Sequence, residues 1–226
     1  MTREELIKKV ALKMDEISSS DDIIVAVNSS DNNPLYTQIN DLLNESINDV
    51  LTKAPIYRIP SAFIETITDI DGEDDESVYR VVDIFSETRK KLKIRVPDDF
   101  IRLASFSDNC FDRAIVDIAI EGDDVDKKQH NRFLVAKNAK PVAVLCRSND
   151  GERNISIYSY STYDIPEFSF CYVKRFTDAS SVESSIELND YMTDLVSWVC
   201  AGRVFAVQGD VNRGKICDEN AAALMI

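Results

Sequence analysis

Three stretches of the sequence carry residue types that can do chemistry. The first, Gly209 to Lys215 (GDVNRGK), has the glycine and lysine spacing of a phosphate-binding P-loop. A P-loop follows a strand and ends in a Ser or Thr whose hydroxyl binds magnesium. This stretch instead follows a helical pattern and has Ile216 at the hydroxyl position. We therefore expect a joint between two helices here, not a nucleotide site.

The second stretch, residues 69–76, concentrates carboxylates: Asp69, Asp71, Glu73, Asp74, Asp75 and Glu76. Such a cluster attracts calcium, but an EF-hand loop needs glycine at its sixth position and glutamate at its twelfth. The spacing here supplies neither. A solvated acidic loop is the expectation, and whether it binds a cation stays open.

The third stretch surrounds His130, the only histidine of the chain. It lies in a predicted polar loop without a sequence signature for a nucleophile or an orienting carboxylate. A Ser-His-Asp or Cys-His arrangement can still form in space, so sequence leaves that possibility open. We expect an exposed loop residue and, for the whole chain, no catalytic, cofactor-binding or metal-binding residues and no enzymatic activity.

The cysteines indicate neither a disulfide framework nor a zinc site. They are odd in number, scattered and without a C-x-x-C pair: Cys110, Cys146, Cys171, Cys200 and Cys217. We expect free thiols in a reducing compartment. The start of the chain has no apolar signal core, and no apolar run reaches the length of about 20 residues that a membrane helix needs. We therefore expect a soluble protein without a membrane partner.

The acids outnumber the bases by 40 to 26, which gives a formal net charge of −14. This balance repels nucleic acid and anionic membranes at long range. The hydrophobic fraction of 44% is that of an ordinary globular protein. A folded chain without general nucleic-acid affinity is therefore expected.

The sequence is organised around Lys91 to Leu103 (KLKIRVPDDFIRL). Apolar Leu92, Ile94 and Val96 alternate with Lys91, Lys93 and Arg95, so one strand face is dry and the other cationic. Pro97 and the aspartates after it predict a tight turn, and Phe100 returns to the core. The cationic face is either solvated or directed at an acidic neighbouring subunit or DNA.

Elements of the flanking regions follow from periodicity. Helices are expected at 2–17, 34–54 and 188–205, with a shorter one at 211–225. Strands are expected at 78–85, 91–96, 100–106, 141–147, 154–160 and 168–176, with a hairpin turn at 148–151. Residues 22–27 and 112–120 stay ambiguous, and 121–131 is predicted to be a polar loop.

This order of elements predicts an α+β fold in which the terminal helices pack together around a mainly antiparallel β region. The expected parts are an N-terminal helical part at 1–56, a β-rich part at 57–185 and a C-terminal helical part at 186–226 that packs on the first. Trp198 flanks the apolar stripe of its helix, and we expect it to pack against the helix at 34–54.

Several segments resemble head-to-tail connector (adaptor or ring) proteins of short-tailed bacteriophages, crAss-like gut phages in particular. They are VPDDFIRL at 96–103, Lys140-Pro141-Val142, FCYVK at 170–174 and LNDYMTDLVSWVCAGRVFAVQGD at 188–210. The resemblance implies a subunit of a ring, usually a dodecamer, in the virion neck between portal and tail. Its partners would be itself, the portal protein and neighbouring connector or tail proteins, and DNA would pass without specific binding.

The family has no catalytic residues or cofactors to carry over. Which ring of the stack this is, the subunit number and the face that lines the channel stay open. The alternatives are an enzyme or small-molecule binding protein whose site assembles only in three dimensions, and a host-derived regulatory or scaffold domain.

Two groups of residues are candidates for a subunit interface. The first is the apolar end Leu224, Met225 and Ile226, which either folds back on its own subunit or docks into a groove on an adjacent one. The second is the cationic face of Lys91, Lys93 and Arg95.

Overall fold

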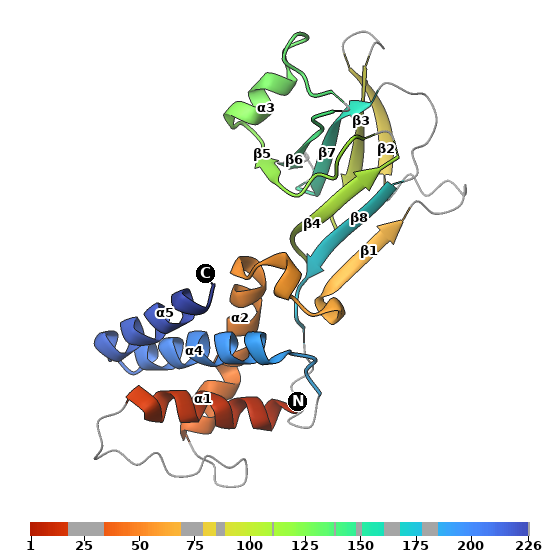
Figure 1. Ribbon diagram of the computed structural model, residues 1–226. Helices are drawn as coiled ribbons and strands as arrows, with labels where there is room; N and C mark the ends of the chain where they lie inside the picture. Colours follow the sequence, from red (N-terminus) through yellow and green to blue (C-terminus); the bar gives the residue numbers. More distant parts are fainter. Residues whose placement is uncertain are drawn as a thin grey trace. The chain divides into compact units, whose positions relative to one another are not determined.

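A computed structural model describes residues 1–17, 34–68, 79–84, 89–109, 111–137, 139–147, 151–160, 168–177 and 185–225. The expectations for 22–27, for the acidic loop at 69–76 and for the turn at 148–150 fall outside these residues, as do Cys110 and Ile226. The described chain is an α+β fold with its terminal helices packed together, as expected. It divides into a helical unit, 1–63 with 175–226, and a β unit, 64–174 (Figure 1). The boundaries expected from sequence were 56/57 and 185/186.

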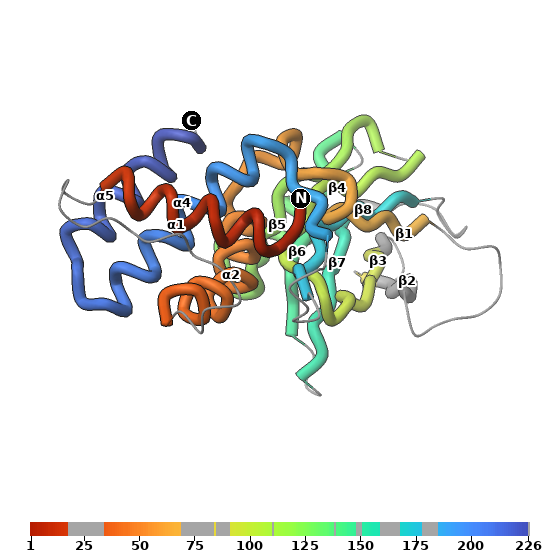
Figure 2. Tube along the Cα trace, turned by 90° about the horizontal axis from the view of Figure 1, so that it is seen from below, coloured from red at the N-terminus to blue at the C-terminus, as the bar shows by residue number. Residues whose placement is uncertain are grey.

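The helical unit is built around α4 (Asp190–Val207), which contacts all three other long helices. These are α1 (Arg3–Ile17), α2 (Pro34–Lys53) and α5 (Val211–Met225). Figure 2 shows the same helices from below. Because α4 has neighbours on several sides, its apolar residues cover most of its circumference instead of a single stripe. Two short 3-10 turns, η2 (Ile56–Arg58) and η3 (Ser61–Phe63), complete the unit.

The helix starts confirm the sequence signals. Thr2 and Glu5 form a reciprocal capping box, with Thr2 N donating to Glu5 Oε2 at 2.8 Å and Glu5 N donating to Thr2 Oγ1 at 3.2 Å. Pro34 occupies the first position of α2, where its missing N–H costs nothing. The apolar stripe of α2 is fully buried at Ile39 and Leu43 and onward to Leu51.

The β unit holds two sheets. One has the order β1-β8-β4, and the other has the order β2-β3-β7-β6-β5. Their strands are β1 (Ile64–Thr68), β2 (Tyr79–Ile84), β3 (Arg89–Arg95), β4 (Phe100–Asp108), β5 (Ile118–Ile120), β6 (Val142–Arg147), β7 (Arg153–Tyr160) and β8 (Phe168–Lys174). All described strand pairs are antiparallel except β5 with β6.

The segment that joins β3 to β4 is the corner between the two sheets. Leu92 and Ile94 are fully buried, so the predicted dry face is confirmed. Phe100 N donates to Pro97 O at 3.1 Å, which closes the predicted turn. Phe100 then enters the core that both sheets share. The turn therefore re-aims the chain from one sheet to the other.

Three expectations need correction. The predicted loop at 121–131 contains a short helix, α3 (Asp124–Gln129), because Asp123 Oδ1 accepts from Val125 N and Asp126 N, both at 2.8 Å. Strand β1 was not predicted. It exists because it pairs along its whole length with β8. The ambiguous segment 112–120 is a strand only at β5.

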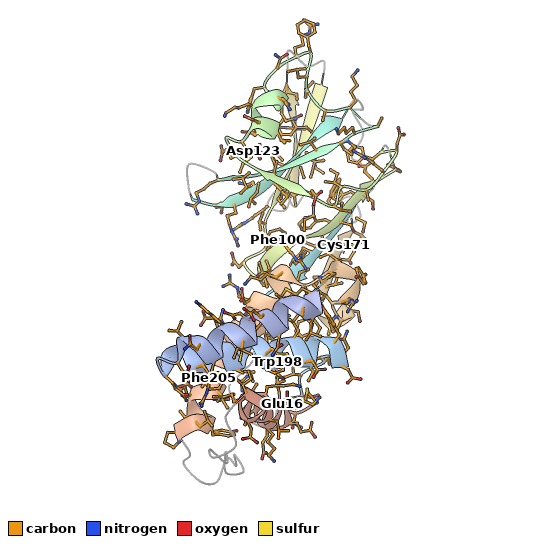
Figure 3. All side chains as sticks on the ribbon, turned by 60° about the vertical axis from the view of Figure 1, so that its left-hand side comes forward. Glu16, Phe100, Asp123, Cys171, Trp198 and Phe205 are labelled. Atoms are coloured by element: carbon orange, nitrogen blue, oxygen red, sulfur yellow. The ribbon has the colours of Figure 1, made fainter. Side chains whose placement is uncertain are left out.

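The placement of Trp198 also differs from the expectation. The structure does not place it on the side of α4 that faces α2. That side carries Arg203, which pairs with Glu45 of α2 at 2.8 Å. Trp198 is half-buried, and the ammonium of Lys13 in α1 lies 4.8 Å from its ring centroid. Figure 3 shows Trp198 on α4. Trp198 is thus a flank residue between α4 and α1.

Candidate functional site

The P-loop-like stretch is a helix joint, as expected. Gly209 adopts a φ of 83°, and its N–H donates to Ala206 O at 3.1 Å. Asp210 N donates to Phe205 O at 2.9 Å, which completes a Schellman termination of α4. Asp210 Oδ1 then accepts from Arg213 N at 3.1 Å and caps α5. The backbone N–H groups of Gly209, Asp210, Arg213 and Gly214 are therefore used by the joint itself.

A polar pocket of about 130 Å³ lies in the β unit. Strands β3, β6 and β7 and the region around α3 supply its walls. Its lining residues are Lys91, Lys93, Glu121, Asp126, His130, Cys146, Arg147, Asn154, Ser156 and Tyr158. The pocket therefore combines cations, carboxylates, a thiol and the histidine.

His130 has the carboxylate partner that sequence did not reveal. Its Nε2 lies 3.4 Å from Asp126 Oδ1, at i and i+4 across the end of α3. Asp126 is only 5% exposed, and its Oδ2 accepts from Gly122 N at 2.8 Å. The imidazole itself stays mostly exposed. The pairing depends on α3, so the cap at Asp123 was the signal that would have revealed it.

Cys146 is the pocket residue closest in type to a nucleophile. Its Sγ lies 3.7 Å from Ser156 Oγ and 3.6 Å from Val144 O. Burial raises the pKa of this thiol, although the contact with Ser156 opposes the effect. The raised pKa keeps Cys146 protonated near neutral pH. Because the thiolate is the reactive form of cysteine, this thiol is a poor nucleophile. The pocket is suited to binding a small polar group more than to nucleophilic attack.

Tyr158 closes the pocket from β7. Burial raises the pKa of its hydroxyl to about 12, and the nearby acidic groups of Cys146, Asp126 and Glu121 add to this. The ammonium of Lys91 lies 5.4 Å from the centroid of its ring. Tyr158 therefore stays neutral and can only donate or accept hydrogen bonds at physiological pH.

The expected interface residues lie in different places. Lys91 and Lys93 line the polar pocket, whereas Arg95 pairs with Glu152 on the surface at 3.2 Å. Leu224 and Met225 are half-buried in the last turn of α5. The cationic candidates therefore belong to the β unit, and the described part of the apolar end belongs to the helical unit.

Sequence reasoning missed a second basic segment, residues 127–140. It contains no Asp or Glu and carries Lys127, Lys128, Arg132, Lys137 and Lys140. All five are exposed. Phe133 at its turn is 88% exposed and Leu134 is 58% exposed. The signal was present in the sequence, but the cations are spaced apart instead of forming a continuous run.

Other groups in the described ranges offer little chemistry. Among these residues there is no cluster of three His, Cys, Asp or Glu that could hold a metal ion. Cys146, Cys171, Cys200 and Cys217 are all free thiols. None of the described helices combines the length and apolar character that crossing a bilayer requires.

Comparison of the sequence with protein-family models and with curated proteins finds no match to either.

Proposed function

We propose that this chain is a structural ring subunit of the head-to-tail connector of a short-tailed bacteriophage, in the virion neck. In this role it pairs with copies of itself, with the portal protein and with neighbouring connector or tail proteins, and it lets DNA pass. The proposal rests on the resemblance of four sequence segments and on the contact between two of them.

The observation that carries the proposal is the contact between two of these segments. Tyr172, in FCYVK of β8, donates from its hydroxyl to Asp99 Oδ1, in VPDDFIRL, at 3.1 Å. Phe100 lies with its ring centroid 5.8 Å from that of Tyr172 and 6.2 Å from that of Phe170. Figure 3 labels Phe100 and Cys171 in this sheet. Segments 73 residues apart thus form one structural unit at the corner.

The remaining segments occupy structural positions as well. Val142, directly after Pro141, begins β6, and the long C-terminal segment forms α4 with its Schellman joint at Asp210. The resembling residues therefore build the corner, a strand start and the central helix.

The test is the assembly state of the purified chain, alone and with the portal protein of the same phage. We expect sedimentation velocity and electron microscopy to show closed rings of identical copies, formed alone or induced by the portal. A chain that stays monomeric under both conditions would rule the proposal out.

A truncation tests the expected role of the tail. Removing residues 224–226 should leave a folded subunit that no longer joins its partner if the apolar end docks on a neighbour. The half-buried Leu224 continues the stripe of Cys217 and Ala221 that packs α5 on α4. If the truncated chain loses its cooperative unfolding transition, the tail belongs to its own core.

The alternative is a small-molecule binding protein or enzyme, and the polar pocket is the observation that favours it. A ligand in this pocket should raise the melting temperature of the wild type but not that of the double variant His130→Ala, Ser156→Val. Turnover that Cys146→Ser abolishes would replace the structural proposal with an enzymatic one.

A further inference from the structure

We propose that the exposed basic segment docks onto an acidic, aromatic face on the helical unit of a second copy of this chain. The basic platform consists of Lys127, Lys128, Arg132, Phe133, Leu134, Lys137 and Lys140. The receiving face consists of Tyr57, Glu187, Asp190 and Asp194. This inference rests on the proposed ring function and names the surfaces that would make the ring.

The turn that presents Phe133 is well built. Asn131 Oδ1 accepts from Phe133 N at 2.9 Å, and Asn131 O accepts from Leu134 N at 3.0 Å and from Val135 N at 2.9 Å. Such an Asx turn fixes the backbone locally. Phe133 is therefore held in solvent by the structure around it.

The segment is also anchored from behind. Val135 and Ala136 are buried in a small apolar cluster with Val144 and Tyr158. The buried Gln129 uses both ends of its amide: Oε1 accepts from Ala136 N and Nε2 donates to Val125 O, each at 2.9 Å. A platform fixed in this way loses little conformational freedom when it binds a partner.

Exposing these apolar side chains has a cost in water. Phe133 is 88% exposed, and moving a Phe side chain from water into an apolar contact is favourable. Leu134, beside it, is more than half exposed. An aromatic side chain in the centre of a polar rim is the usual anatomy of an interface hot spot.

The cations of the platform are available for a partner. Lys127 pairs with Asp124 at 3.6 Å. Lys128, Arg132, Lys137 and Lys140 make no ion pair with any residue that the structure describes. The platform thus presents unneutralised positive charge on a chain whose net charge is −14.

A second copy is the partner that the charges favour. All 40 acids of the chain lie outside residues 127–140. On the helical unit, Glu187, Asp190 and Asp194 are exposed at the start of α4, and within the described ranges none of them forms an ion pair. Tyr57, which is 79% exposed, lies in the η2 turn. This turn adjoins the start of α4, because Asn189 Nδ2 donates to Arg58 O at 2.9 Å. The guanidinium of Arg58 lies 5.7 Å from the centroid of the Tyr57 ring, so the face carries one cation beside its three carboxylates. Acidic and aromatic groups there complement the basic and aromatic groups of the platform.

The two surfaces belong to different units of one chain. In the proposed ring the contact is heterologous, which means that each copy gives its platform to one neighbour and its receiving face to another. A repeated contact of this kind closes into a ring when the rotation between copies allows it.

The experiment is a charge swap read by sedimentation velocity over a range of protein concentrations, with the portal protein added if the wild type needs it. The platform variant is Lys128→Glu, Arg132→Glu, Lys137→Glu, and the receiving variant is Glu187→Lys, Asp194→Lys. Each should weaken self-association by at least about tenfold, and the five changes together should recover most of it. The control matched to the platform variant is Arg113→Glu, Arg175→Glu, Lys215→Glu, which makes the same change in net charge as that variant at exposed sites elsewhere.

A single change, Phe133→Ser, tests the apolar anchor without altering charge and should also weaken assembly by about tenfold. Circular dichroism checks that every variant is folded. Platform and receiving variants that assemble like the control overturn the inference and leave the ring function intact, whereas a wild type that never assembles overturns both. If the platform variant assembles normally but loses a DNA oligonucleotide that the wild type binds, the platform is a nucleic-acid surface and the inference is wrong.

Discussion

Gly202 of α4 and Gly214 of α5 lie against each other where the two helices cross. A Cβ atom on Gly202 would stand 3.2 Å from both Asp218 Oδ1 and Cys217 Cβ, and one on Gly214 would stand 3.4 Å from Gly202 O. The joint at Gly209 turns the chain so that these positions meet. Because neither glycine has a side chain, the two helices approach each other closely here. Cys217 is fully buried at this crossing.

Replacing Gly202 with alanine should therefore lower the free energy of unfolding by about 1 to 2 kcal/mol. The crowding against Cys217 costs about 1 to 3 kcal/mol, and the better helix propensity of alanine returns up to about 1 kcal/mol. Urea denaturation measures the difference. Ala222→Leu, on the exposed side of α5, is the control and should change stability by less than about 0.5 kcal/mol. A Gly202→Ala variant more stable than wild type would contradict the close crossing.

Arg3 should be the charged residue whose loss most weakens the contact of α1 with α2. It is 2% exposed, and its guanidinium donates to Asn40 Oδ1 and Asn44 Oδ1, each at 2.7 Å. Arg3→Ala should lower the free energy of unfolding by about 2 to 4 kcal/mol, because it leaves two partly buried acceptors unpaired. Arg3→Lys should recover less than half of this, since an ammonium cannot reproduce the fork. Full recovery by lysine in a denaturant titration would argue against the bidentate contact.

The placement of Trp198 changes its expected contribution. Replacing a fully buried tryptophan with alanine lowers the free energy of unfolding by about 3 to 5 kcal/mol. Because Trp198 is half-buried beside Lys13, Trp198→Ala should lower it by about 2 kcal/mol. Lys13→Met removes the cation over the Trp198 ring and should lower the free energy of unfolding by at most about 1 kcal/mol. Because Trp198 is the only tryptophan of the chain, far-UV circular dichroism during urea unfolding is the measurement for both variants. A loss above about 3 kcal/mol for Trp198→Ala would restore the original expectation of a core residue.

The cysteines should differ in reactivity. Burial raises the pKa of Cys171, but hydrogen bonds with Thr66, Ser169 and Ser105 outweigh this and lower the pKa overall. Burial raises the pKa of Cys217 to about 11. A thiol reagent at about pH 7.5 should therefore label Cys171 first among the described cysteines, with mass spectrometry of peptides as the readout. Faster labelling of Cys217 in the folded protein would mean that α5 opens.

Cys200 should make the protein less stable in alkali. Burial raises the pKa of this thiol from 9.0 to about 11. Since the folded state holds the proton more tightly, the stabilisation is fully present below pH 9 and is lost as the pH rises toward 11. Between about pH 8 and about pH 10.5 the loss from this group is about 2 kcal/mol. The Cys200→Ala variant should lose correspondingly less over that range than the wild type. Parallel stability curves for the two proteins would contradict the raised pKa.

Local patterns predicted the elements whose signals are self-contained. The capping box at Thr2, the proline that begins α2 and the alternation of Leu92 and Ile94 each depend on neighbours in sequence. The glycine pair 209 and 214 likewise indicated a helix joint once the missing hydroxyl at Ile216 was considered. Each of these features is confirmed.

What sequence did not provide depends on distant partners. Strand β1 has a mixed polar pattern and becomes a strand through its pairing with β8. The position of Trp198 in the sequence of α4 is compatible with packing against α1 or α2, and only the structure shows that it lies beside α1. The contact of His130 with Asp126 needs α3, whose short length gives no periodic signal.

The chain enters and leaves the β unit at one place. Ile64 at the start of β1 is the ladder partner of Val173 near the end of β8, so these backbones are about one strand spacing apart, roughly 5 Å. The helical unit is made of two chain segments, 1–63 and 175–226, separated by this insertion. A short linker could therefore span the gap left by removing the whole β unit. The β unit is therefore an insertion whose two ends lie side by side. Recombination at those two ends can replace it or change its size while the helices continue to pack together.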